Sequence, residues 1–142
     1  MRMIAIAALA GMLALPATAH EFGPAGLMDR TNRTELPPLT LASGKPLAEE
    51  TYQLKSGGYY TIEITSDGSA ELAIAGPEFF RAIWINEVVI NDIEIRPLGV
   101  ASLEFDDEGT AKISFVAITP GSYTVMIPGT TGESQRASFV IK

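Results

Sequence analysis

Few residues in this chain have side chains suited to metal binding or nucleophilic catalysis. Its 142 residues include one histidine, His20, and no cysteine. Without thiolates the chain cannot form a disulfide, an iron–sulfur cluster, a cysteine zinc site or a copper–thiolate centre. A single imidazole also excludes sites built from several histidines. The sequence contains no serine-nucleophile elbow, phosphate-binding loop or dinucleotide fingerprint, so we expect a protein without enzymatic activity.

His20 is a candidate metal ligand near the start of the chain. If a signal peptide is removed after Ala19, the new α-amino group and the imidazole belong to one residue and together could chelate Cu(II). Such a site needs further ligands, and the nearest candidates are Met28, Glu21 and Asp29. The simpler interpretation, which the sequence favours, is that His20 is only the first residue after the cleavage site.

The acidic side chains give no defined site by their spacing alone. Residues 106–109, Asp-Asp-Glu-Gly, lack the alternating ligands and the distal glutamate of a calcium-binding EF-hand loop. A charged hairpin turn between two strands is the better interpretation of this segment. The chain has 17 acidic residues, so many pairs are conceivable and none is singled out.

Aromatic residues are concentrated in the segment Pro77–Trp84, which could begin with a single helical turn because proline suits the first helical position. We expect Trp84 to lie in the core of the protein. Phe79, Phe80 and Arg81 could either belong to the core or form an exposed anchor for a partner protein. In a strand, alternation would not allow both phenylalanines on one inner face.

The first nineteen residues have the pattern of a secretory signal peptide. Arg2 precedes an apolar run of 13 residues from Met3 to Leu15, and Ala17-Thr18-Ala19 is a cleavage site with small residues. A membrane-spanning helix needs about 20 apolar residues, and no later stretch approaches that length. We therefore expect export to the periplasm without a membrane span in the mature protein.

The charge balance restricts the class of partner. Lys and Arg total 10 and Asp and Glu total 17, which gives a formal net charge of −7. Nucleic acid is excluded as a partner because a strongly acidic chain is repelled by the phosphate backbone.

After the signal peptide the sequence divides into an arm and a domain. Residues 20–47 are rich in glycine, proline and polar residues, and they predict an extended N-terminal arm with one short strand at residues 39–42. Two consecutive prolines, Pro37 and Pro38, exclude a helix before that strand. The domain is expected at residues 48–142.

Two-fold periodicity dominates the expected domain. Tyr60, Ile62 and Ile64 fall on one face of a strand that ends in a turn at residues 66–68. Further strands are expected at residues 70–75, 83–90, 93–95, 100–105, 111–118, 122–127 and 137–141. Short strands separated by turn residues at this spacing predict an all-β antiparallel sandwich.

The C-terminal part of the domain resembles cupredoxins. Residues 115–129 contain a strand, the sequence Pro120-Gly121-Ser122-Tyr123 and a second strand, the order in which cupredoxins lead into their copper loop. Residues 61–68 are similar to the strand and turn before a cupredoxin's first histidine ligand. The resemblance covers residues 48–142 and implies a Greek-key β-sandwich of the plastocyanin and azurin type. Pro-Gly-x-Tyr also occurs in other sandwiches, where the tyrosine packs at a corner.

The same resemblance shows that the copper ligands are missing. The cysteine position falls on Ile127, the first-histidine position falls near Glu71, and residues 130–133 provide neither the second histidine nor the axial methionine. A blue-copper site needs a thiolate and two imidazoles, so type-1 copper is excluded. Glu71 and Glu133 could converge at the former ligand end and bind a hard ion such as iron weakly. The simpler interpretation is that both are ordinary surface glutamates.

The resemblance implies an exported, non-enzymatic accessory protein in the periplasmic handling of copper or iron. Any metal would be bound weakly, by His20 with its free amine or by Glu71, and the expected partner is a periplasmic metal-transport or redox protein. The alternative is a protein–protein interaction module that uses the sandwich as a scaffold without metal, through Phe79, Phe80 and Arg81.

Overall fold

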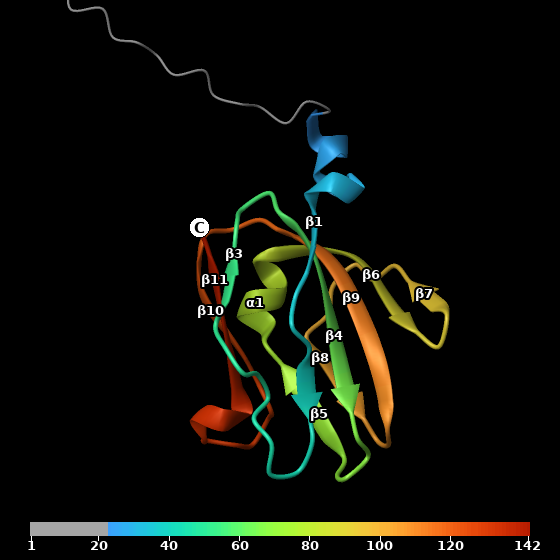
Figure 1. Ribbon diagram of the computed structural model, residues 1–142, viewed down its shortest axis with the longest axis vertical. Coiled ribbons are helices and arrows are strands. Elements are labelled where there is room, and N and C mark those ends of the chain that lie inside the picture. Colours follow the sequence, from blue (N-terminus) through green and yellow to red (C-terminus); the bar gives the residue numbers. More distant parts are fainter. Residues whose placement is uncertain (1–22) are drawn as a thin grey trace, which may run out of the picture.

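The chain folds into two facing β-sheets, with a short helix between them at one end (Figure 1). The computed structural model describes residues 23–142. The first sheet contains β1 (Arg33–Glu35), β2 (Leu39–Leu41), β4 (Tyr59–Ser66), β6 (Ile83–Ile90), β7 (Ile93–Ile95) and β9 (Gly109–Ala117). The second contains β3 (Tyr52–Leu54), β5 (Leu72–Ala75), β8 (Ser102–Phe105), β10 (Gly121–Met126) and β11 (Arg136–Ile141). The helical segments are η1 (Gly23–Met28), η2 (Arg30–Asn32), α1 (Pro77–Arg81) and η3 (Glu133–Gln135).

The all-β sandwich predicted from the sequence is confirmed, but its sheets are mixed and not antiparallel throughout. The strand order is β1-β4-β9-β6-β7 in the first sheet, with β2 also on β4, and β3-β11-β10-β5-β8 in the second. β1 and β2 run parallel to β4, and β3 runs parallel to β11. These three strands reach their partners through long connections, which parallel pairing requires, and not through tight hairpins. No helix among residues 23–142 is long and apolar enough to cross a membrane.

The segment expected to be an extended arm, residues 20–47, is part of the sandwich from β1 onward. The short strand expected there is present as β2, and β1 precedes it on the same edge of β4. Leu39, Leu41 and Leu47 are at most 2 % exposed and belong to the core. Burying a leucine side chain contributes about 2 kcal/mol, so the arm helps to stabilise the domain and no boundary falls at residue 48.

Aromatic side chains from both sheets meet around α1. The ring of Phe79 stacks on Phe139 of β11 with centroids 4.2 Å apart and stands edge-on to Phe115 of β9 at 5.8 Å. Phe80 is buried beside Phe79. Both phenylalanines can be buried because α1 is helical, as the proline at its start suggested, so strand alternation does not separate them.

The expected anchor of Phe79, Phe80 and Arg81 is therefore not an exposed aromatic surface. The Arg81 side chain alone of the three faces solvent, and it pairs with Glu78 at 3.1 Å. An exposed ion pair of this kind contributes little to stability.

Trp84 lies on the surface, so its predicted core position is wrong. Ile83 and Ile85 point into the core, and the alternation of β6 turns the residue between them outward. Trp84 is 49 % exposed. At the other end of β6, Asn91 and Asp92 have positive φ angles of 47° and 64°, which suit a tight two-residue hairpin to β7.

Candidate functional site

The loop that follows β10 is closed by hydrogen bonds around Ile127. The Ile127 backbone N–H donates to the carbonyl of Gln135 at 3.0 Å, and the Thr130 hydroxyl donates to the carbonyl of Ile127 at 2.6 Å. The Ile127 side chain is 8 % exposed and packs in the core. Residues 23–142 contain no histidine or cysteine, so the residues of this loop do not fit a type-1 copper ion.

Glu71 lies in a group of three carboxylates on the second sheet. Carboxylate oxygens of Glu71, Glu104 and Asp106 lie within 4.8 Å of one another, and all three residues are exposed. Among the described residues, none of the three forms an ion pair with lysine or arginine. Glu133, which was expected beside Glu71, does not belong to this group. Carboxylate oxygens suit hard cations such as calcium or iron.

The pairing of β5 with β8 explains how the carboxylate group forms. Leu72 lies opposite Phe105 and Ala73 lies opposite Glu104, so Glu71 is brought level with Asp106 at the end of the ladder. Glu104 and Asp106 are two residues apart and share a face. The sequence shows that alternation, but not which strand lies beside β8, so Glu104 and Asp106 were not predicted as partners of Glu71.

The acidic segment at residues 106–109 connects β8 of the second sheet to β9 of the first. It is therefore a connection between sheets and not the expected hairpin turn. The Asp107 carboxylate accepts a hydrogen bond from the Glu108 backbone N–H at 2.8 Å. The segment packs closely on the turn after β4, where a Cβ atom added to Gly68 would lie 2.8 Å from Asp107 Oδ1.

The turn after β4 is held by the side chain of Asp67. Hydrogen bonds from the Ser69 hydroxyl and backbone N–H lower the pKa of Asp67 below its usual value. Gly68 has a positive φ of 70°, which glycine adopts without strain. These features confirm the turn expected at residues 66–68, and they keep Asp67 negatively charged near the acidic connection.

His20 lies outside the described residues, and Glu71 lies far from the point where the described chain begins. η1 begins at Gly23, at the end of the molecule remote from the start of β5 (Figure 1).

The candidate helpers of His20 have separate environments. Asp29 caps η2, where its carboxylate accepts hydrogen bonds from the Thr31 backbone N–H at 2.8 Å and hydroxyl at 2.7 Å. Met28 is exposed in η1 and lines a hollow of about 250 Å³ with Trp84. Glu21 lies outside the described residues.

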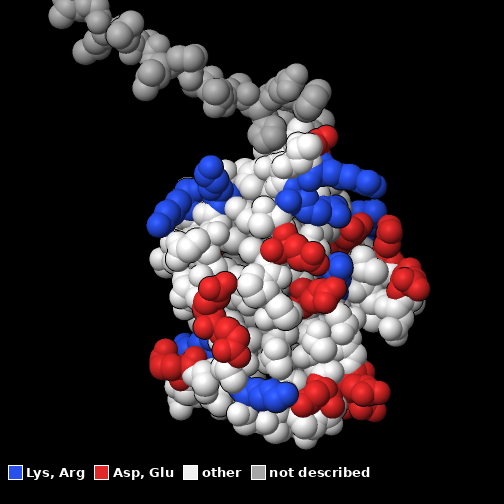
Figure 2. Space-filling model, in the orientation of Figure 1, with Lys and Arg blue, Asp and Glu red and all other residues white. Residues whose placement is uncertain are grey.

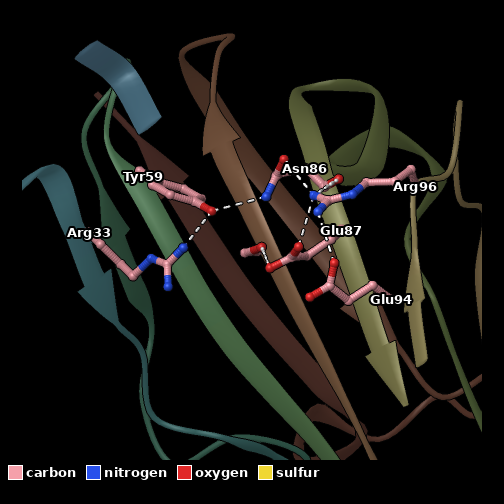
Figure 3. A network of polar contacts seen from close by, with 7 residues as sticks. Arg33, Tyr59, Asn86, Glu87, Glu94 and Arg96 are labelled. Carbon is pink, nitrogen blue, oxygen red and sulfur yellow. Dashed lines mark hydrogen bonds and ion pairs between the residues drawn. The ribbon is translucent and has the colours of Figure 1, made fainter. Parts of the chain in front are cut away.

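A polar network covers the outer face of the first sheet (Figure 3). Its centre is the hydroxyl of Tyr59, a residue that is only 1 % exposed. Arg33 of β1 donates to this hydroxyl at 2.7 Å, and Asn86 of β6 donates to it at 3.1 Å. The hydrogen bonds join β1, β4 and β6, and sequence patterns did not reveal them because the three residues are far apart in the chain.

The network continues to β7 through Arg96. Its guanidinium donates to Asn86 Oδ1 at 3.1 Å and pairs with Glu87 at 2.8 Å and Glu94 at 3.0 Å. Ser114 of β9 donates to Glu87 at 3.2 Å. The charges of Arg96, Glu87 and Glu94 are paired with one another, and these contacts stabilise the sheet. On the same face, the buried Thr61 hydroxyl has no hydrogen-bond partner among residues 23–142.

Charged side chains are unevenly distributed on the surface. On the face shown in Figure 2, basic side chains gather mainly near the end where the described chain begins, with others at the opposite end, and acidic ones spread over the middle and that opposite end. The carboxylates of Glu71, Glu104 and Asp106 add to the negative charge of the end remote from η1.

Comparison with known proteins identifies the fold but not a family. No protein-family model and no curated protein matches the sequence. Solved structures do match, among them a multicopper oxidase from Pseudomonas thermotolerans, with a TM-score of 0.57, 17 % identity and coverage of 80 % of this chain and 31 % of that chain. A multicopper oxidase from Campylobacter jejuni, described as a metallo-oxidase, has a TM-score of 0.54, 6 % identity and coverage of 78 % and 30 %. Copper nitrite reductase from Nitrosomonas europaea matches with a TM-score of 0.52 and 15 % identity, and the match covers 67 % of this chain and 33 % of that chain.

The matched regions are cupredoxin-like domains, and this chain has the same cupredoxin-like fold without a cysteine for type-1 copper. The chain spans about a third of the length of the solved structures it matches. Sequence identities this low establish a shared architecture and do not transfer the activity of the larger proteins.

Proposed function

We propose that the protein is an exported, non-enzymatic accessory of periplasmic metal handling that acts on copper or iron without a blue-copper centre. The observation that carries the proposal is a cupredoxin-like fold in which core Ile127 replaces the thiolate while Glu71 joins a three-carboxylate group. The structural neighbours are named as copper enzymes, which makes copper a metal to test, and the carboxylate oxygens make iron a second one.

Two separate sites are proposed, because the donor atoms at His20 and at Glu71 suit different metal ions. A free amine and imidazole at His20 suit Cu(II). The oxygens of Glu71, Glu104 and Asp106 suit a harder ion such as Fe(III). Both sites would be open to solvent, which favours exchange of the metal with a periplasmic transport or redox protein over permanent retention.

The test starts from protein secreted into the periplasm, with its N-terminus read by mass spectrometry. A terminus at His20 is expected. Calorimetric titration with Cu(II), Cu(I) and Fe(III) should show micromolar or tighter binding of at least one ion. Cu(II) binding should be lost in a form with one extra residue before His20. Fe(III) binding should be lost in Glu71→Gln but kept in Glu133→Gln, the matched control outside the carboxylate group.

Absence of binding with all three ions would refute metal handling and leave the second candidate, an interaction module without metal. Its expected anchor is no longer available because Phe79 and Phe80 are buried. The free edge of β8 is the feature that still favours this second function.

A further inference from the structure

Strand β8 is a sheet edge with two chemically different faces. It is the last strand of the second sheet and pairs only with β5 among the strands of residues 23–142. Leu103 and Phe105 pack, half-buried, against the core. Glu104 and Asp106 are exposed and alternate with them. The edge therefore presents apolar side chains on one side and carboxylates on the other.

A groove lies between this edge and the first sheet. Its volume is about 250 Å³, and its apolar lining comes from Leu103 and Phe105 of β8, Ile90 of β6 and Ala111 of β9. The acidic connection at residues 106–109 also lines it. The two sheets thus leave a groove on the open side of the sandwich whose lining is partly apolar and partly acidic.

Negative charge at this edge is concentrated and not neutralised by ion pairs within residues 23–142. The oxygens of Glu71, Glu104 and Asp106 lie within 4.8 Å of one another, and no ion pair involves them. Pairing of this edge with that of a second copy would place like charges side by side, which is destabilising. A cationic strand would relieve the repulsion.

We propose that the edge of β8 is a docking site for an extended segment of a partner protein in which apolar residues alternate with lysine or arginine. The segment adds to the sheet as a further strand and forms backbone hydrogen bonds with the free edge. Its apolar side chains enter the groove beside Leu103 and Phe105. Its cationic side chains, two residues apart, lie over Glu104 and Asp106. This interaction requires no metal, but it uses two of the carboxylates proposed to hold Fe(III), so a bound ion and the partner strand would compete for Glu104 and Asp106.

The test uses synthetic nine-residue peptides with blocked ends and the purified chain in a chelator-containing buffer of low ionic strength. The first peptide alternates lysine and valine. The second contains the same residues in two blocks, and the third alternates glutamate and valine. We expect the first to bind at least about tenfold more tightly than the second, and the third not to bind. Hydrogen exchange measured by mass spectrometry should show slower exchange at residues 102–106 when the first peptide is present.

Two variants with equal loss of charge test the position of the site. The double variant Glu104→Gln with Asp106→Asn should weaken binding of the alternating peptide at least about tenfold. Glu49→Gln with Glu50→Gln, which removes two exposed charges elsewhere, should change it less than about threefold. Circular dichroism checks that both variants fold.

Equal binding of the alternating and block peptides, or equal effects of the two double variants, would overturn the inference and indicate unspecific attraction to an acidic protein. Slowed hydrogen exchange outside β8 would also overturn the inference. Absence of peptide binding would overturn it as well, in a protein whose carboxylates are shown to be accessible by their binding of Fe(III). Failure of the metal titrations leaves this test unaffected, because the peptide assay is performed with chelator present.

Discussion

Replacing Phe79 with alanine should destabilise the protein much more than replacing Trp84, although tryptophan is the larger residue. Phe79 is 3 % exposed and touches aromatic rings from both sheets, whereas Trp84 is 49 % exposed on the outside of β6. The comparison separates the observed structure from the sequence expectation, in which Trp84 belonged to the core.

The expected magnitudes follow from burial and ring contacts. Truncation of a buried phenylalanine to alanine costs about 3–5 kcal/mol. For Phe79 we expect the upper part of this range, because stacking on Phe139 at 4.2 Å and edge contact with Phe115 at 5.8 Å are lost as well. Half-burial of Trp84 removes roughly 100 Å² from water, so Trp84→Ala should cost at most about 2 kcal/mol.

Urea denaturation followed by far-ultraviolet circular dichroism measures both changes on one scale. With a slope of about 1–3 kcal/mol per molar urea, a difference of about 3 kcal/mol separates the two midpoints by at least about 1 M. Trp84 is the only tryptophan, so acrylamide quenching of wild-type fluorescence checks its exposure independently. A Trp84→Ala midpoint as low as that of Phe79→Ala, or a tryptophan protected from acrylamide, would refute this account of the core.

Three further predictions test contacts within the sandwich, and the urea midpoint is the measurement in each case. Tyr59→Phe removes a buried hydroxyl that accepts two hydrogen bonds and should cost about 1–2 kcal/mol, and Asn86→Ala combined with it should cost less than the sum of the two changes. Burial raises the pKa of Tyr52 to about 12, so its contribution to stability is complete below pH 10 and is lost as the pH rises towards 12; Tyr52→Phe should flatten this decline. Gly76→Ala places a Cβ 2.8 Å from a core valine methyl and should cost about 1–3 kcal/mol, whereas Gly99→Ala, with nothing within 4 Å, should be neutral within about 0.5 kcal/mol.

Local patterns predicted those strands that are defined by their own residues and by the turns beside them. The strands at residues 83–90 and 93–95 have the predicted bounds, since apolar residues and the Asn91-Asp92 turn define them locally. β1 and β3 were missed, because each has only three residues and is stabilised by a distant parallel partner. The arm was assigned outside the domain for the same reason, since the burial of Leu47 depends on strands far away in sequence.

Of the three carboxylates in the candidate site, only Glu71 was predicted from the sequence. The resemblance placed Glu71 at the former ligand end, but Glu104 and Asp106 reach it through the register of β5 on β8. Trp84 was misplaced because a hydrophobic strand does not reveal which of its faces meets the other sheet. Contacts between strands that are far apart in the chain are therefore what the sequence alone could not predict.

The structure explains how this fold can persist without a metal in the usual loop. In a site made of loop residues, the metal itself joins strands and loop. Here Ile127 anchors the loop in the core, and its backbone bonds with Gln135 and Thr130 close it. The carboxylate group of Glu71 contains none of these three residues, so release of a metal from that group would leave the loop closed. A carrier must stay folded before it takes up an ion and after it passes the ion on. A scaffold that binds a partner strand at β8 must likewise stay folded without its ligand.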